Sequence, residues 1–264
     1  MINNITFFLR SSYYNLLAQF QYKVNFIVSL LSVSLDVLCN LLVFYFIFSK
    51  FHNLAGWNFQ QVIFLYAIFL AGHGLVLTFS LNLWGFFNYL ITGNLDRLRV
   101  RPRNILLQLL STSFSISAFI YFIASVVLII YAWIEIGIPD TLGLVIAMII
   151  SVISSCFVEL SITLIFVSLS FWLVNTSSLI SLNVQVLNDF LGYPLNIYNN
   201  TLRVIFTVIY PIAFMNYYPG LFFLKPSTKN FILLMITPLI ASILFYLAVR
   251  LFFKGMKEYQ SVGS

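Results

Sequence analysis

Three ionisable side chains, Asp36, His73 and Glu159, lie inside long apolar stretches of the sequence. Ionisable groups are costly to place in apolar segments, so each of the three is a candidate functional residue. Carboxylates and an imidazole could pass a proton between them, and a relay through all three is one hypothesis. No second His and no carboxylate stands at metal-ligand spacing from His73, so we predict no metal site.

Asp36 belongs to a polar stripe on one face of its helix. At 100° per residue, the members of this stripe fall on one narrow face, and lipid cannot satisfy their hydrogen bonds. Two interpretations therefore stay open: a wall of a translocation pathway, or a helix–helix interface held by small polar side chains. The stripe consists of Asn25, Ser29, Ser32, Asp36 and Asn40.

His73 and Glu159 have neighbours that indicate buried helices. His73 stands between Gly72 and Gly74, which would let another helix approach closely, so we favour a structural hydrogen bond for this side chain. Ser155 and Thr163 lie four residues on either side of Glu159 and share its helical face. We therefore predict that the helix of Glu159 is buried within a bundle.

The composition indicates the class of protein that holds these side chains. The chain has 264 residues, of which 61% are hydrophobic and 8% are charged, and its mean hydropathy is +1.01. Soluble domains carry about 25% charged residues, so an ordinary soluble enzyme and a nucleic-acid-binding module are excluded. We predict an all-α integral membrane protein, in which each crossing needs about 20 apolar residues.

The apolar runs predict one transmembrane domain over residues 1–264, with six membrane-spanning helices. An amphipathic helix at 3–22 and a second helix at 176–191, which Gly192 and Pro194 would end, are predicted to lie on the membrane surface. The six spans are predicted at about 24–48, 61–83, 113–134, 141–173, 202–218 and 231–253.

Basic residues indicate the orientation, because they accumulate in cytoplasmic loops. Six spans place ten Lys and Arg residues on the side of the termini, and only Lys50, Lys225 and Lys229 on the other side. This bias predicts that both termini lie in the cytoplasm. The ten residues are Arg10, Lys23, Arg97, Arg99, Arg101, Arg103, Arg203, Arg250, Lys254 and Lys257.

The densest group of charges lies at 94–104, between the second and third predicted spans. Four arginines alternate there with apolar residues, and Pro102 then interrupts the segment, so we predict a short structured cytoplasmic element that a partner could contact. The chain contains no Gly-x-x-x-x-Gly-Lys-Ser/Thr loop, no His-Glu-x-x-His and no Gly-x-Ser-x-Gly. The arginines are Arg97, Arg99, Arg101 and Arg103.

The same cluster resembles part of a known family. The segment LDRLRVRPRNILLQ at 95–108 resembles the region between spans two and three of ABC-2 type permeases, the membrane subunits of bacterial ABC exporters. The segments YPLNIY at 193–198 and PIAFMNYYP at 211–219 resemble the fifth-span signature of that family. Six spans, cytoplasmic termini and an interfacial first helix also match, so the resemblance covers nearly the whole chain.

The resemblance implies a permease that is not itself an enzyme and binds no cofactor. ATP and Mg²⁺ would bind a separate ABC ATPase, and two copies of this ATPase would join two permeases, identical or paralogous, in the bacterial cytoplasmic membrane. Membrane lipid would surround the permeases, and no nucleic acid partner is expected. The ATPase-coupling residues would be Leu95, Asp96, Arg97, Leu98, Arg99, Arg101 and Pro102, with Leu95 and Leu98 as apolar anchors in a groove of the ATPase.

Two other functions compete with this one. A stand-alone proton- or ion-coupled secondary transporter would use Asp36 and Glu159. An intramembrane enzyme has less support, because the sequence offers no nucleophile–base pair and no metal ligand set. An ATPase gene beside this one would favour the permease, whereas an isolated gene would favour the stand-alone transporter. The sequence predicts no particular substrate.

Overall fold

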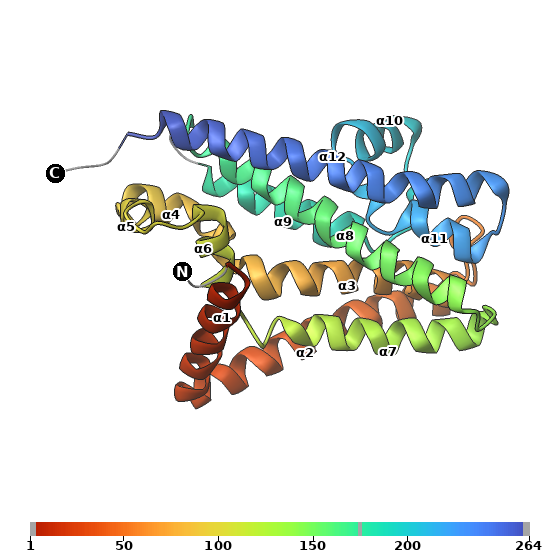
Figure 1. Cartoon of the computed structure of the whole chain (residues 1–264). Helices are drawn as coiled ribbons and strands as arrows, with labels where there is room; N and C mark the ends of the chain where they lie inside the picture. The colour runs from red at the N-terminus through yellow and green to blue at the C-terminus, as the bar shows by residue number, and fades with distance from the viewer. Residues whose placement is uncertain (1–3, 174–175, 261–264) are drawn as a thin grey trace.

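The computed structural model describes residues 4–173 and 176–260, which form helices and turns without a β-strand in these ranges (Figure 1). Five helices are long and apolar enough to cross a membrane. Four of them coincide with predicted spans, whereas α7 begins later than predicted because residues 112–118 are not helical. The five are α2 (Lys23–Lys50), α3 (Phe59–Trp84), α7 (Phe119–Ile136), α8 (Leu142–Leu169) and α12 (Thr228–Glu258).

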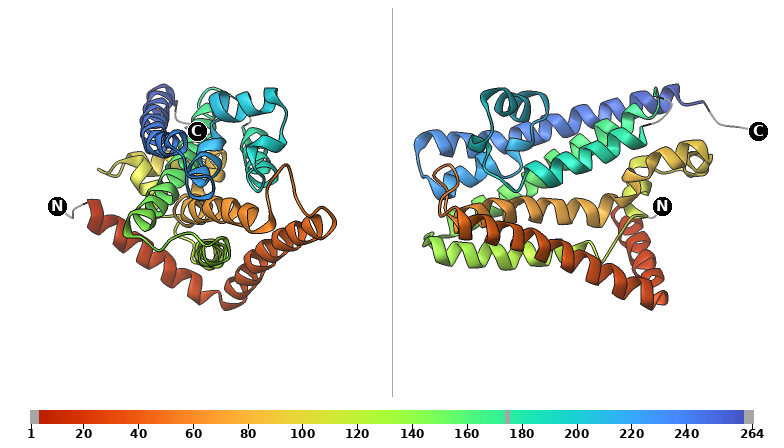
Figure 2. Two further views of the ribbon diagram at one scale, coloured as in Figure 1. Left: turned by 90° about the vertical axis from the view of Figure 1, so that its right-hand side faces the viewer. Right: turned by 180° about the vertical axis from the view of Figure 1, so that it is seen from behind.

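Helix α3 forms the centre of the bundle (Figure 2). Every residue from 62 to 74 is buried, as expected for a helix that is apolar on all sides. Helices α7 and α8 each pack along α3, and α12 packs along α8. Helix α2 lies at the edge of the bundle and keeps most of its surface exposed.

Helix α9 (Ser177–Phe190) runs along α8 instead of lying on the membrane surface (Figure 2). At its start, the hydroxyls of Thr176 and Ser170 lie 2.5 Å apart, close to the end of α8. Beyond its end, Asn196 Oδ1 accepts a hydrogen bond from Trp57 Nε1 at the opposite end of the bundle, in the loop between α2 and α3. The prediction of a surface helix at 176–191 is therefore wrong, because this segment follows the length of the bundle.

The predicted fifth span at 202–218 is not one helix. The chain bends by 77° between two short helical segments. Pro211 stands at the bend, where its missing N–H group prevents a continuous helical hydrogen-bond ladder. The segments are α10 (Asn200–Val204), a π-helical turn (Ile205–Ile209), a 3₁₀ turn (Ile212–Phe214) and α11 (Tyr217–Leu224).

Both ends of this bent pair lie at the same end of the bundle. Before α10, Asn196 Nδ2 donates to the carbonyl oxygen of Ala55, at 3.1 Å. After α11, Lys225 Nζ lies 4.5 Å from the centre of the Trp57 ring. Since Ala55 and Trp57 share the loop 51–58, the bent pair enters and returns at this end, which is the geometry of a re-entrant segment.

Arg203 lies at this end as well, because its guanidinium donates to the carbonyl oxygen of Asn196. Its assignment to the side of the termini is therefore wrong. Moving this one residue changes the distribution of basic residues from ten against three to nine against four. Most basic residues still lie on the side of the termini, and the cytoplasmic placement of both termini stays a prediction.

The opposite end of the bundle holds the described termini and four helices that are not spans. Helix α1 lies crosswise to the long helices (Figure 1), as expected for an interfacial helix. Its side chains bind the backbone before α7: Asn15 donates to the carbonyl oxygen of Ser111, the last residue of α6, at 3.2 Å, and Gln19 donates to that of Phe114 in the non-helical segment. The four helices are α1 (Asn4–Gln21), α4 (Phe86–Ile91), α5 (Asn94–Arg99) and α6 (Ile105–Ser111).

Candidate functional site

Two of the three candidate ionisable residues meet in the centre of the bundle. His73 Nδ1 on α3 and Glu159 Oε1 on α8 lie 2.7 Å apart, within hydrogen-bonding and ion-pairing distance. The exposed fraction is 6% for His73 and 0% for Glu159. The other carboxylate oxygen, Glu159 Oε2, has no hydrogen-bond partner among the described residues. The pair is thus a single polar link between two apolar helices.

The two glycines beside His73 allow neighbouring helices to come close on two sides. A Cβ atom on Gly72 would lie 2.8 Å from Ser155 Cβ on α8. A Cβ atom on Gly74 would lie 2.5 Å from the backbone nitrogen of Phe122 on α7. The glycines therefore set the separation at which α8 presents Glu159 and α7 presents its own side chains to His73.

Alanine at either glycine should destabilise the fold, by about 1–3 kcal/mol or more, because overpacking forces helices apart. We expect Ser155→Gly to restore part of the stability lost in Gly72→Ala, since it removes the side chain that the new methyl group meets. No side-chain truncation should restore Gly74→Ala, where the obstacle is backbone. Thermal unfolding in detergent measures these effects.

Gly143→Ala is the matched control for both variants, because a Cβ atom there meets nothing within 4 Å. It should leave the midpoint of unfolding unchanged or raise it, since alanine favours a helix more than glycine does. Wild-type unfolding of Gly74→Ala would contradict the close approach of α3 and α7.

Asp36 approaches the buried pair through Tyr121. The Tyr121 hydroxyl on α7 donates to Asp36 Oδ2 on α2 at 3.0 Å. The Tyr121 ring meets the His73 ring edge-on, with ring centres 5.7 Å apart. The three candidates therefore lie along one line of contacts, but the described hydrogen bonds do not join Tyr121 to His73, and the predicted proton relay has a gap there.

The polar stripe of α2 is not covered by the rest of this chain. Asn25, Ser32 and Asp36 are exposed, and Ser29 and Asn40 are half-buried. The serines and Asn40 donate to backbone carbonyl oxygens one turn earlier in α2. The serines and Asn40 are therefore satisfied within α2, and among the described hydrogen bonds Asp36 alone joins the stripe to another helix, through Tyr121 of α7.

The coupling residues implied by the resemblance divide into a buried and an exposed set. Leu95 and Leu98 are 0% and 8% exposed and pack in a hydrophobic cluster with residues of α3, α4, α6, α8 and α12. The expectation that they anchor in a groove of a partner is therefore wrong, because they fill the core of their own chain. Asp96 is half-buried. The exposed set is Arg97, Arg99, Val100, Arg101 and Pro102, which we call the docking loop.

Gln108 holds the docking loop in place from below. Its side chain is fully buried, and its Nε2 donates to the carbonyl oxygens of Leu98 and Arg103, each at 3.1 Å. Leu98 lies between Arg97 and Arg99 of the loop, and Arg103 directly follows Pro102. One buried amide thus closes the loop into a defined shape.

Comparison with known families identifies the class of this protein. Residues 35–263 match the family described as ABC-2 family transporter protein, which covers α3, α8 and the docking loop. The chain belongs to the ABC-2 transporter family. No curated protein and no solved structure matches the chain. It is accordingly a permease of the ABC type and a multi-pass membrane protein, with five or six helical segments of suitable length and polarity.

Two residues that organise the site of this ABC-2 permease are missed by sequence reasoning alone. Tyr121 is one of two tyrosines in its helix, with Tyr131, and nothing in the pattern singles it out. Gln108 does carry a signal, because it is the one amide in the apolar run 105–110. A lone amide in such a run indicates a buried hydrogen-bonding role.

Proposed function

We propose that this ABC-2 family protein is the permease subunit of an ATP-driven exporter. Two copies of a separate ABC ATPase would bind ATP and Mg²⁺ at the cytoplasmic side, and two permeases would form the translocation pathway in the bacterial cytoplasmic membrane. The docking loop carries this proposal. It lies at the end of the bundle beside Leu95 and Leu98, which are buried in the core, and its own residues are exposed.

The exposed side of the docking loop suits a protein partner. Val100 is 85% exposed, the largest exposed fraction among the large apolar residues described. Arg97 and Arg101 are exposed beside it. An apolar side chain with charged side chains around it fits the apolar core and polar rim of a protein interface.

A displacement of the docking loop would be transmitted to the membrane helices through the hydrophobic cluster that contains Leu95 and Leu98. Leu95 shares this cluster with Leu164 of α8 and Phe252 of α12. After α12, the Tyr259 hydroxyl donates to Asp96 Oδ2 at 3.5 Å. Closure of the ATPases would therefore act on α8 and α12 together and bias the permease between inward- and outward-open states.

The polar stripe of α2 supports a pathway or contact between two copies. Asp36 and its neighbours are exposed on the single chain, although lipid cannot satisfy a carboxylate in mid-span. A second permease copy, or water in a pathway between the copies, would supply the hydrogen bonds to this carboxylate that lipid cannot form.

Val100→Asp should weaken binding of the proposed partner ATPase by about 2 kcal/mol or more. A carboxylate at an apolar anchor must be desolvated without a partner when the interface forms. Co-purification of the ATPase with the permease, together with ATP turnover of the complex, measures the loss.

Leu142→Asp is the control for this test. Leu142 is 76% exposed at the start of α8, at the opposite end of the bundle, so the same chemical change there should leave ATPase binding intact. If Val100→Asp binds the ATPase as wild type does, the docking loop is not the ATPase site.

A stand-alone proton-coupled transporter is the second candidate, and the contacts of Asp36, Tyr121, His73 and Glu159 favour it. Asp36→Asn separates the two functions, because asparagine can still accept the Tyr121 hydrogen bond but carries no charge. For the permease, we expect Asp36→Asn to keep ATP turnover, whereas Asp36→Leu should reduce cross-linking between copies.

The proton-coupled alternative predicts that the permease moves protons without an ATPase. Proteoliposomes that hold the permease without an ATPase should take up protons under an imposed pH gradient, and Asp36→Asn should abolish this uptake. We expect no such uptake from the wild-type chain. Asp36-dependent uptake would replace the exporter proposal with the alternative.

A further inference from the structure

Helices α7 and α8 follow each other in the chain, yet they pack chiefly on α3 and not on one another. They diverge from the short hairpin at 137–141 (Figure 1). Two antiparallel neighbours usually pack along their length. Their separation leaves a groove on this side of the bundle, with α3 beneath it.

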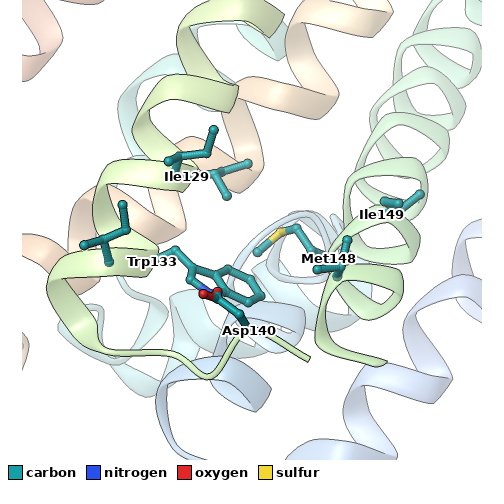
Figure 3. Close-up of a pocket in the computed structure, with 8 residues that line it drawn as sticks. Ile129, Trp133, Asp140, Met148 and Ile149 are labelled. Atoms are coloured by element: carbon teal, nitrogen blue, oxygen red, sulfur yellow. The ribbon is translucent and has the colours of Figure 1, made fainter. Parts of the chain in front are cut away.

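The groove consists of two adjoining pockets of about 400 and 300 Å³. The first lies at the hairpin, between Trp133 and Met148 (Figure 3). The second continues toward mid-helix, where Ala71 and Leu75 of α3 form part of its lining. Both pockets are lined by Ile129, Ile130, Met148 and Ile149, so they lie next to each other along the same two helices.

The position of the groove determines the chemistry of its occupant. Ile130 and Ile149 are 54% and 53% exposed and face outward from the bundle of a multi-pass membrane protein. The helices satisfy their own backbone groups, and beyond Trp133 and Asp140 in the first pocket the lining side chains are aliphatic, aromatic or methionine. A flexible hydrocarbon chain suits such an apolar groove between two helices.

The mouth of the groove is acidic. Asp140 lines the first pocket and accepts a hydrogen bond from Trp133 Nε1 at 2.9 Å, which fixes its carboxylate at the mouth (Figure 3). Asp140 remains exposed and forms no ion pair with a described residue. The sequence contains no Lys or Arg between Arg103 and Arg203, so the hairpin brings no positive charge of its own.

We propose that the groove between α7 and α8 binds one membrane phospholipid whose head group carries a primary ammonium, a phosphatidylethanolamine. One acyl chain lies along Ile129, Ile130, Met148 and Ile149, and the ammonium pairs with Asp140. The negative mouth disfavours a phospholipid with a net negative head group. The lipid takes the place of direct packing between α7 and α8.

Native mass spectrometry of the full-length permease tests the head-group preference. The protein is released from membranes and exchanged into detergent with phosphatidylethanolamine or phosphatidylglycerol of identical acyl chains. We expect one retained phosphatidylethanolamine per chain and about three- to fivefold less phosphatidylglycerol, the effect of one partly exposed ion pair. Asp140→Asn should remove this preference, because it keeps the acceptor for Trp133 but not the charge, whereas Glu135→Gln near the end of α7 should preserve it.

Filling the groove tests the acyl-chain site. Ile130→Trp with Ile149→Trp should remove retention of both lipids, while Val127→Trp with Ile146→Trp, exposed on the same two helices but outside the pockets, should retain them. Equal retention of the two lipids by wild type overturns the proposal. So does disulfide formation between copies through Ile130→Cys or Ile149→Cys, in a background without Cys39 and Cys156, because a second permease would then cover the groove.

Discussion

His73→Leu should lower the free energy of unfolding by about 3–5 kcal/mol, because it leaves the buried Glu159 carboxyl group without its one described hydrogen-bond partner. The Glu159 side chain is 0% exposed, its Oε2 has no described hydrogen-bond partner, and the imidazole is the one described partner of its Oε1. Unfolding of the purified permease by increasing SDS in mixed micelles measures the change.

The double variant His73→Leu/Glu159→Met should unfold within about 1 kcal/mol of wild type, since replacing a buried pair by apolar side chains of similar size is often neutral. This recovery distinguishes the loss of a partner from general damage to the core. If the double variant is as unstable as His73→Leu, the deficit comes from packing around α3 and not from an unpaired carboxylate.

The double variant also shows what the pair contributes to transport. The pair joins α3 to α8, and α8 shares the cluster beneath the docking loop. A single hydrogen bond can break and form again as two helices move. If the pair holds one of the two transport states, the stable double variant should keep ATPase binding and show altered ATP turnover. Unchanged turnover would limit its role to helix packing.

The sequence identifies both residues of the buried pair as unusual, but it does not predict that they contact each other. His73 and Glu159 stand out because apolar segments rarely hold ionisable groups, and the adjacent Gly72 and Gly74 indicate close packing. The contact itself joins residues 86 positions apart. No periodicity within one helix determines which residues of another helix it meets.

Hydropathy misassigns the segment between α8 and α12 for a physical reason. It reports how apolar a segment is and not which way the segment runs. Helix α9 contains Asn and Ser yet follows the bundle, because its buried face contacts protein instead of lipid. The segment 202–218 is apolar enough to cross, but Pro211 and the turns around it bend the chain back.

The docking loop illustrates a similar limit on a smaller scale. The spacing of Leu95 and Leu98 correctly indicates that both lie on one face of a short helix. It leaves open whether that face meets a partner or the chain itself. The contacts with α8 and α12 decide this, and they come from residues that are far away in the sequence.

Leu95→Ala should therefore act on stability first, by about 2–5 kcal/mol, because it opens a cavity under a side chain that is 0% exposed. Leu95→Met, which nearly conserves volume, should cost less than about 1.5 kcal/mol. The same truncation in α1, Leu17→Ala, removes a side chain that is 42% exposed and should have little effect. Unfolding in SDS ranks the three variants.

Measured below its unfolding transition, Leu95→Ala should still bind the ATPase through the docking loop but turn over ATP with weaker coupling. The reason is that the cavity loosens the contact between the loop and α8 and α12. The opposite outcome would be wild-type stability together with lost ATPase binding. Leu95 would then contact the partner directly, and Val100 would not be the anchor of the interface.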